Sequence, residues 1–331
     1  MQFPFRFTRL CALAMVVLAP ALASVTSHAQ SWPTKPIRII NPFPAGGGTD
    51  TFARPWAAKL SQPGFLGQSV FIENQGGAGG TVGATNASRA APDGNTFFMG
   101  AIHHTIAESV YTKLPYSIEK DFVPITVIAY VPQVMVVHPK HGFKTLKDLI
   151  DYAKANPGKL NFGSPGSGTA HHLAMELFMN VTGTKMVHVP YRGAGPMMQD
   201  FLAGMIDVVF DGMGTSAAQI KGGKLRALAV ATPQRLPGFP DIPTMDESNV
   251  PGMVVSTWYA LWAIKGTPPE IIERMYRETA KVLQEPDIKE IWLSAASVPG
   301  GQPPAEFATL VHSEIVRWAK VVKDAGVKLD L

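Results

Sequence analysis

Short apolar runs alternate with longer amphipathic stretches along most of the chain. Strand patterns bounded by glycine, proline or polar residues cover residues 37–40, 69–73, 96–99, 160–163, 186–189, 206–210 and 225–231. Helical patterns between them cover residues 49–58, 81–90, 146–155, 170–182, 197–203 and 217–220. This alternation predicts α/β architecture with largely parallel sheets.

The pattern also predicts two passages of the chain between two lobes. Residues 122–130 and 133–137 predict two strands separated by Pro132, at the first crossover, and residues 254–264 predict the return strand. Two helical stretches with one apolar face each follow at 271–283 and 307–322, and Gly326 is expected to end the last helix. We therefore predict two lobes with the two crossover strands as a hinge, and C-terminal helices packed on the first lobe.

Glycine-rich loops join several predicted strands to the helices that follow, at residues 44–50, 76–80, 164–169 and 190–196. Glycine lets the backbone approach a ligand, and the first amides of a helix lack partners and carry the positive end of its dipole. Thr49 or Asp50 is expected to cap the first of these helices. Any one loop is equally well explained as a tight turn that binds nothing. Because ligands in open α/β sheets lie beyond the carboxyl ends of strands, the repetition predicts an anion-binding cleft between the lobes.

Residues 1–29 differ from the rest of the chain and predict a secretory signal peptide. Arg6 and Arg9 precede or flank an apolar stretch at 11–23, and Ser27-His28-Ala29 offers a cleavage site near Ala29. Cleavage would remove the single cysteine of the chain. We expect an exported, periplasmic protein without disulfides, and no later apolar run is long enough to span a membrane.

The charge and the motifs exclude several classes of function. The whole chain carries a net charge of +4, and loss of Arg6 and Arg9 leaves 27 bases against 25 acids, or +2, so no nucleic-acid partner is predicted. Val82 stands where a dinucleotide-binding loop needs its third glycine, and the 164–169 loop lacks the lysine of a phosphate-binding loop. We predict no cofactor.

A metal site is also not predicted. His172 and Glu176 are four residues apart on one helix, but no third residue stands at a spacing typical of metal-binding motifs. Without a metal, His171 is expected to pack on the helix face that carries Met175 and Phe178. His172 is then expected to meet solvent or Glu176.

Several side chains near the glycine loops are candidates for ligand contact. His103 and His104 follow a strand end and are expected to face the cleft, where one donates to an anionic ligand; a satisfied loop histidine is the alternative. Arg192 either pairs with a carboxylate in bidentate fashion or lies solvated on its turn.

The remaining candidates are aromatic or acidic. Phe43 and Tyr191 either wall a pocket or pack between the lobes. Asp211 follows a strand and would repel a carboxylate, so we expect it to order a water or a lysine beside the ligand.

Taken together, these motifs resemble one family along the whole mature chain. The matching segments are residues 37–50, 73–80, 92–94, 113–116, 121–122, 162–171, 189–193, 225–230 and 258–259. They are similar to the Bug-type solute-binding receptors of tripartite tricarboxylate transporters. The resemblance implies a two-lobed periplasmic binding protein type II fold that closes on a small organic anion, usually a carboxylate. It also implies delivery of that ligand to the large and small membrane subunits of a transporter.

The resemblance further implies which parts of this chain form the lobes and the site. Lobe 1 comprises residues 30–132 and 257–331, and lobe 2 comprises residues 133–256. Backbone amides and bridging waters would hold one ligand carboxylate. The implied contacts are, from lobe 1, Phe43, Ala45, Gly46 and Gly47, and from lobe 2, Ser164, Gly168, Thr169, Tyr191, Arg192 and Gly193. The predicted set of ligand-binding residues is completed by Asp50, His103, His104 and Asp211.

One departure from the family pattern bears on the ligand. Where better-known members have small hydroxyl residues before an Asn-Pro pair, this chain has His103-His104 and then Glu108-Ser109. Two imidazoles suggest a larger ligand or one with a second carboxylate, such as an aromatic acid or a longer dicarboxylate.

The leading hypothesis is a monomeric receptor that captures its ligand by hinge closure, without catalysis. A periplasmic sensor that presents the ligand to a signalling receptor is one alternative. A secreted hydrolase using Ser164 or Ser167 with His171 is another, although the sequence shows no oriented base and acid around either serine.

Overall fold

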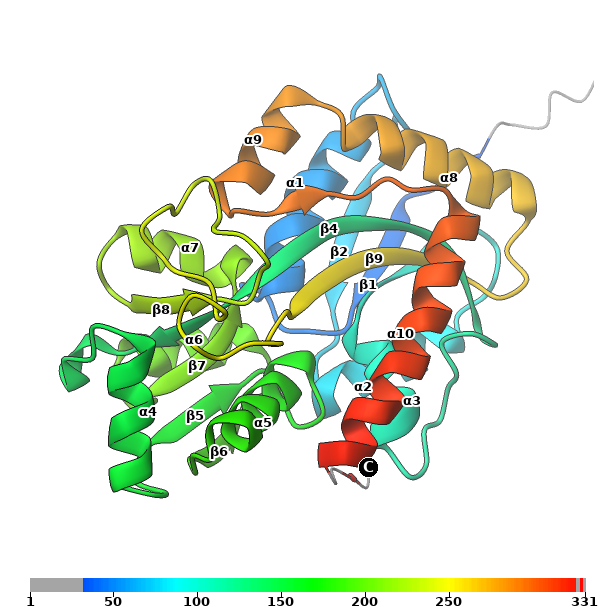
Figure 1. Ribbon diagram of the computed structural model, residues 1–331. Helices are drawn as coiled ribbons and strands as arrows, with labels where there is room; N and C mark the ends of the chain where they lie inside the picture. Colours follow the sequence, from blue (N-terminus) through cyan, green and yellow to red (C-terminus); the bar gives the residue numbers. More distant parts are fainter. Residues whose placement is uncertain (1–31, 326–327, 330–331) are drawn as a thin grey trace, which may run out of the picture. The chain divides into compact units, whose positions relative to one another are not determined.

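Ten strands among the described residues pair into one mixed sheet (Figure 1). The computed structural model describes residues 32–325 and 328–329, so the predicted signal peptide, its cleavage near Ala29 and the helix stop at Gly326 lie outside the described residues. Residues 33–331 form one unit. The strands are β1 (Ile37–Asn41), β2 (Val70–Asn74), β3 (Thr96–Ala101), β4 (Phe122–Val137), β5 (Asn161–Ser164), β6 (Val187–Pro190), β7 (Val208–Gly212), β8 (Arg226–Val230), β9 (Ser256–Ile264) and β10 (Val298–Pro299).

The strand order is β2-β1-β3-β9-β4-β7-β5-β6, and β8 and β10 pair with β4. The pairs β1–β2, β1–β3, β5–β6 and β5–β7 are parallel. The pairs that involve β4 or β9 are antiparallel, because these two strands cross the sheet in opposite directions. The expected parallel arrangement therefore holds for the outer strands and not for the centre.

The long strand β4 divides the sheet into two halves. From Phe122 to Pro132 it pairs with β9, and from Gln133 to Val137 it pairs with β7 and β8. The prediction of two strands separated by Pro132 is wrong. Pro132 faces Ser256, the first residue of β9, so it lies where β4 changes partners and its missing N–H costs the ladder little. Below, the first half means β1–β3, β9 and the elements packed on them, and the second half means β5–β8 and theirs.

The helices of the first half are α1 (Gly48–Leu60), α2 (Thr81–Ser88), α3 (His103–Val110), α8 (Pro269–Val282), α9 (Pro286–Ser294) and α10 (Pro304–Ala325), with the short 3₁₀ helix η1 (Ala78–Gly80). Helix α10 packs against α3 and β4, and α8 packs against α1. The C-terminal helices thus return to the first half, as the sequence predicts. Trp258 and Trp262 of β9 anchor α10 there, with ring centroids 5.6 and 4.9 Å from Phe307.

The second half carries α4 (Leu146–Ala155), α5 (Ala170–Thr182), α6 (Ala194–Leu202) and α7 (Met213–Lys221), with η2 (Pro139–His141) before α4. The spacing of Thr145 and Asp148 in the sequence predicts a capping box at the start of α4. The box is present, since Thr145 accepts from the Asp148 amide and Asp148 accepts from the Thr145 amide. Helices α6 and α7 begin earlier than the sequence pattern indicates. Their first turns contain glycine, which is typical of a loop in sequence, and α7 starts directly after β7.

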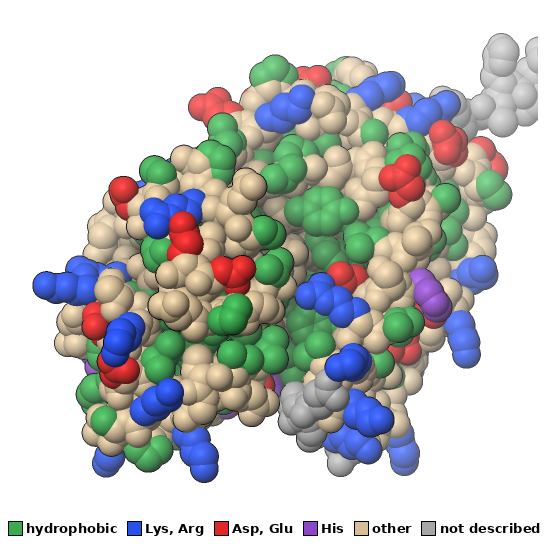
Figure 2. Space-filling view, in the orientation of Figure 1, with side chains coloured by type: hydrophobic (Ala, Val, Ile, Leu, Met, Phe, Trp, Pro, Cys, Tyr) green, Lys and Arg blue, Asp and Glu red, His purple; other side chains and the backbone are tan. Residues whose placement is uncertain are grey.

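The surface carries no dominant charge on the face shown in Figure 2, where basic and acidic side chains are intermingled. This agrees with the small net charge. No helix of the described residues is long and apolar enough to span a membrane.

Candidate ligand-binding site

A small cavity forms where loops and helix starts of the two halves meet. Its free space is about 10 Å³, roughly that of one water molecule. It lies at the carboxyl ends of β1, β3 and β5, where the glycine-loop pattern predicts a ligand site. The lining residues are Phe43, Gly47, Gly48, Thr49, His103, Pro165, His171, Ala194 and Tyr259.

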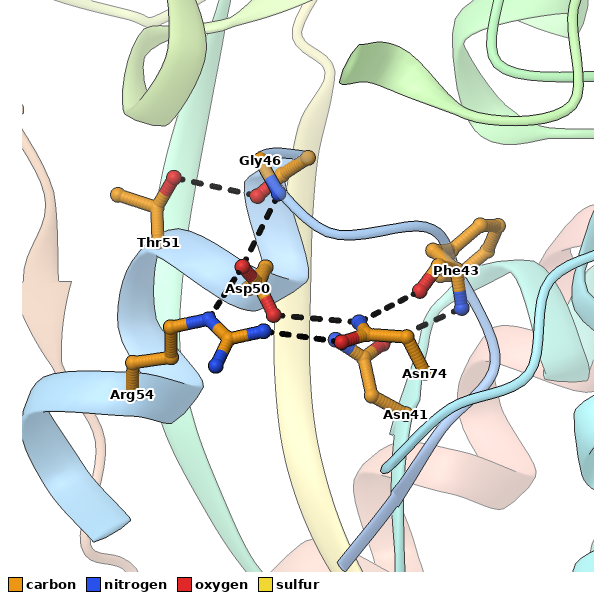
Figure 3. Close-up of polar contacts among 8 residues, drawn as sticks. Asn41, Phe43, Gly46, Asp50, Thr51, Arg54 and Asn74 are labelled. Carbon is orange, nitrogen blue, oxygen red and sulfur yellow. Dashed lines mark hydrogen bonds and ion pairs between the residues drawn. The ribbon is translucent and has the colours of Figure 1, made fainter. Parts of the chain in front are cut away.

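The start of α1 supplies one wall of the cavity, and it is not capped as predicted. Gly47 is the N-cap residue, and no side chain bonds at that position. Asp50 instead accepts from the Gly46 amide at 3.0 Å, from Arg54 Nε at 2.7 Å and from Asn74 Nδ2 at 3.1 Å (Figure 3). The expectation that Thr49 or Asp50 caps α1 is therefore wrong, because the Asp50 carboxylate reaches past the N-cap to the preceding loop.

The loop before α1 is held in place by side chains of the neighbouring strands. Asn74 also donates to the Phe43 carbonyl at 2.8 Å, and Asn41 accepts from the Phe43 amide at 3.3 Å (Figure 3). Burial raises the pKa of Asp50, but hydrogen bonds from Arg54, Gly46 and Asn74 outweigh burial and leave the pKa below its ordinary value. The ionised Asp50 is thus part of the support of the loop and does not line the cavity.

The start of α6 faces the start of α1 across the two halves. A Cβ on Gly47 would lie 3.8 Å from the Ala194 Cβ, and one on Gly193 would lie 2.5 Å from Pro44 Cδ. A Cβ on Gly195 would lie 2.9 Å from the Ala45 carbonyl oxygen. The approaches at Gly193 and Gly195 require glycine, whereas the contact at Gly47 has ordinary van der Waals length, so the start of α6 packs closely on the loop before α1.

This meeting of helix starts creates an electrostatic site for an anion. The amides of Gly47, Gly48 and Thr49 have no backbone partner among the described residues. Each helix start carries roughly half a positive charge, so an anion between α1 and α6 would be stabilised by both dipoles without a basic side chain. Of the loop residues predicted to bind, Gly47 lines the cavity, while Ala45 and Gly46 are exposed beside it.

At the start of α5, which was also predicted to bind an anion, the amides of Gly168 and Thr169 already have hydrogen-bond partners. Thr169 caps this helix and its hydroxyl donates to the Gly166 carbonyl. The Gly168 amide donates to His172 Nδ1 at 3.2 Å, and the Thr169 amide donates to Gly166. Gly168 and Thr169 therefore shape their loop in this structure, and their amides are not free for a ligand.

Ser164 is likewise engaged within the second half. Its side chain is fully buried, and its Oγ lies 2.7 Å from His188 Nε2 and 3.0 Å from the Gly166 carbonyl. His188 stacks on His172, with ring centroids 4.0 Å apart. The histidine beside Ser164 is thus His188, and not the His171 considered from sequence.

His103 faces the cavity and bridges the two halves. Its Nδ1 accepts a hydrogen bond of 3.1 Å from the amide of Ala170, the first residue of α5. Its ring lies 5.4 Å from that of Phe43 and 5.3 Å from that of His171. Burial, together with the neighbouring His171 and His104, lowers the pKa of His103 well below its ordinary value, so the ring is neutral.

His104 turns the other way. Its Nδ1 accepts from the Ala101 amide at 3.0 Å, and its ring packs edge-on against Phe98 with centroids 4.9 Å apart. It is buried and does not line the cavity, so the expectation that both histidines face the cleft holds for His103 alone. Burial lowers the pKa of His104 to about 4.

His171 lines the cavity, whereas the sequence pattern suggested mere helix packing. Its Nε2 lies 3.9 Å from Asp211 Oδ1, and Asp211 Oδ2 accepts from Thr215 and Ser216 at 2.6 Å each. Asp211 Oδ1 and His171 Nδ1 are buried without a hydrogen-bond partner among the described residues. Burial lowers the pKa of His171, and the Asp211 carboxylate partly offsets this effect. Asp211 therefore lies behind His171, consistent with a supporting role.

The remaining predicted residues lie outside the cavity. Tyr191 donates to Asp200 at 2.8 Å, and Arg192 is exposed. Both border an outer groove of about 380 Å³ with these other lining residues: Ala78, Gly79, Tyr111, Gly166, Ser167, Pro190 and Leu329. Gly193 is the N-cap of α6. Ligand contact at each predicted residue stays a prediction.

Two further observations bear on the sequence-based candidates. His172 Nε2 lies 3.5 Å from Glu176, as one of the expected alternatives had it, and no group of three or more metal-ligating side chains occurs in the described part of the chain. Sequence reasoning missed Tyr259, which stands in β9 without a nearby glycine motif. A tyrosine in a buried strand gives no local signal of cavity lining.

Comparisons with known proteins agree with this architecture. A family model described as the tripartite tricarboxylate transporter family receptor matches residues 53–327. The protein BugT of Bordetella pertussis is 36% identical over 324 residues, covering 97% of this chain and 99% of that protein. The structure of Rpa4515 from R. palustris with adipate has a TM-score of 0.87 and 34% identity, covering 91% of this chain and all of that one. The structure of MatC from Rhodopseudomonas palustris with bound malate has a TM-score of 0.83 and 31% identity, covering 88% and 99%.

Two α/β halves joined by a pair of long strands, with helix starts facing each other between them, define a periplasmic solute-binding protein. The chain belongs to the receptor family of the tripartite tricarboxylate transporters, which includes the Bug proteins.

Proposed function

We propose that this protein is an extracytoplasmic receptor that captures a small organic carboxylate between α1 and α6. The observation that carries the proposal is the direct approach of two helix N-termini beside a cavity lined by Gly47, Gly48 and Thr49, whose amides have no backbone partner in the described part of the chain. Relatives of similar structure were solved with adipate and with malate, and both ligands are carboxylates. A carboxylate group would occupy the space between the helix starts, which is about the size of one water molecule.

Capture would proceed by closure of two lobes. We propose residues 30–132 with 257–331 as lobe 1 and residues 133–256 as lobe 2, with β4 and β9 as the hinge. The change of partners along β4 at Pro132 and Gln133 supports this division. A ligand that contacts both α1 and α6 would stabilise the closed state by its differential affinity.

The receptor would act after export, as a monomer, and would deliver its ligand to the large and small membrane subunits of a transporter. We propose binding without chemical conversion. Of the two serines considered as nucleophiles, Ser164 is fully buried, pairs with His188 and does not line the cavity. Ser167 borders the outer groove instead of the cavity.

A binding screen tests the proposal. The protein, purified from the periplasm of an expression host, is heated with mono-, di- and tricarboxylates, and hits are measured by calorimetry. A ligand at a hundred times its Kd adds about 2.7 kcal/mol to the free energy of unfolding, so a ligand gives a clear thermal shift. A folded, ligand-free protein that binds no carboxylate would contradict the proposal.

A matched pair of variants locates the site. Gly47→Ala adds a methyl group 3.4 Å from the Pro44 carbonyl oxygen and 3.8 Å from Ala194, which fits the fold but fills the space between the helix starts. Gly64→Ala adds a methyl group with nothing within 4 Å. We expect G47A to weaken carboxylate binding about tenfold or more and G64A to leave it unchanged. Uptake of the labelled ligand by cells with and without the membrane subunits separates a transport receptor from a sensor.

A further inference from the structure

One imidazole ring makes a hydrogen bond between the two halves of the molecule. His103 is the first residue of α3 in the first half, and its Nδ1 accepts the amide proton of Ala170, which opens α5 in the second half. The distance is 3.1 Å, and His103 as a residue is only 4% exposed. The bond takes up an amide at the helix start that a ligand anion would otherwise meet.

This bond fixes the tautomer of the ring. A backbone amide only donates, so Nδ1 must be the unprotonated acceptor, and in the neutral ring the proton resides on Nε2. Nε2 has no hydrogen-bond partner among the described residues, and His103 lines the cavity. His103 therefore has one N–H group left to offer to a ligand.

The polar groups around His103 do not use this donor. His104, one residue further along α3, is turned to Ala101, and His171 of α5 is directed by its Nε2 toward Asp211. Phe43 packs edge-on against the His103 ring from the loop before α1. A ligand that fills the cavity is thus the available partner of the His103 Nε2–H group.

We propose that His103 determines ligand specificity and couples it to closure, with a different ring nitrogen for each role. Nε2–H donates to an acceptor oxygen of a ligand bound in the cavity that His103 shares with the starts of α1 and α6, and Nδ1 holds α5 against the first half. This rests on the proposed function. The ligand class is a carboxylate with a second acceptor group, such as a dicarboxylate, and an ammonium group at that position is excluded because it brings a second donor.

Two substitutions separate the two nitrogens. In His103→Asn the amide oxygen occupies the position of Nδ1, so the bond from Ala170 is kept and the Nε2 donor is lost. In His103→Gln the amide nitrogen occupies the position of Nε2, so the donor is kept and the bond from Ala170 is lost. His172→Asn is the matched control, because His172 Nδ1 also accepts a backbone amide, from Gly168, but within the second half and away from the cavity.

The test uses two readouts on the exported protein. Calorimetry with adipate and with hexanoate compares two six-carbon acids that differ by the second carboxylate. Distances between spin labels on Gln62→Cys in the first half and Lys154→Cys in the second report closure, and the single native cysteine lies in the predicted signal peptide. Both label sites are exposed.

We expect the wild type and H172N to prefer adipate over hexanoate by about tenfold or more. H103N should lose this preference and keep the wild-type label distances, while H103Q should retain part of the preference and show a larger fraction of longer distances. An unchanged preference in H103N overturns the role of Nε2, and unchanged distances in H103Q overturn the role of Nδ1.

The outcome also distinguishes this inference from the proposed function. A wild type that binds both acids equally well leaves the receptor function standing and overturns the specificity role of His103. A wild type that binds no carboxylate overturns the proposed function and the Nε2 role together, while the label distances of the ligand-free H103Q protein still decide the Nδ1 role.

Discussion

Tyr259 places its phenol oxygen directly against the backbone of Gly48, so closely that a Cβ on Gly48 would lie 2.1 Å from it. Gly48 is the first residue of α1, and Tyr259 stands in β9, one of the two strands that join the halves. Both residues line the cavity. The start of α1, where we propose that the anion binds, is thus positioned against a joining strand by a contact that requires glycine.

This contact predicts that a substitution of Tyr259 restores ligand affinity lost by a substitution of Gly48. Gly48→Ala should displace the start of α1 and lower carboxylate affinity about tenfold or more, because overpacking at a rigid contact costs about 1–3 kcal/mol. Tyr259→Phe removes the oxygen that the new methyl group meets, so the double variant should recover part of the affinity. Calorimetry on the two single variants and the double variant measures the coupling. Additive losses would show that the contact does not position the helix.

The Asp50 network predicts a specific loss of stability. Asp50→Asn replaces one acceptor oxygen with an NH2 group, although all three partners, Gly46, Arg54 and Asn74, are donors. Losing hydrogen bonds to a buried charge should lower the free energy of unfolding by about 1–3 kcal/mol. Urea unfolding measures this change. Asp151→Asn removes an exposed ion pair with Lys147 and should cost less than about 1 kcal/mol, so equal losses in the two variants would contradict the role of Asp50.

The sequence predicted the meeting of the glycine loops for a physical reason. Ligands in open α/β sheets lie beyond the carboxyl ends of strands, and the glycine loops that open α1 and α6 follow the carboxyl ends of β1 and β6. The capping box at Thr145 was predicted equally well, because its two partners are only three residues apart.

What the sequence could not predict depends on distant partners. His103 and His104 are neighbours on one helix, and only the bond to Ala170, 67 residues away, distinguishes the one that faces the cavity. Asp50 has the sequence position of a cap, yet Asn74 and Arg54 draw its carboxylate toward the preceding loop. Pro132 looks like a strand break until the change of partners along β4 is known.

The buried histidines predict a loss of stability in mild acid. Burial lowers the pKa of His104 from 6.5 to about 4, whereas in the unfolded chain it stays near 6.5. The unfolded state therefore takes up the proton first, so the stabilising contribution is complete above pH 6.5 and is lost as the pH falls toward 4. The shift corresponds to about 3 kcal/mol as an order of magnitude, and burial lowers the pKa of His103 and His171 in the same direction.

Urea unfolding at a series of pH values checks this prediction. His104→Asn keeps an acceptor for the Ala101 amide and cannot titrate, so its stability should fall less steeply below pH 6.5 than that of the wild type. His312→Asn is the control, since His312 is exposed and paired with Glu119 on the surface. Identical slopes in the wild type and H104N would mean that His104 does not titrate differently on folding.

Tyr111 predicts a kinetic effect on ligand release. Its hydroxyl donates to the Ala78 carbonyl oxygen at 3.1 Å in the first half and lies 3.4 Å from the Ser167 carbonyl oxygen in the second, at the edge of the outer groove. Tyr111→Phe removes this link without changing the ring. One net hydrogen bond contributes about 0.5–1.5 kcal/mol, so the carboxylate should dissociate about two- to tenfold faster. Stopped-flow displacement measures the rate. Tyr152→Phe, at an exposed position of α4, removes a hydroxyl that does not border the groove and should leave the rate unchanged. A Y111F protein that releases ligand at the wild-type rate would show that opening of the halves at this edge does not limit dissociation.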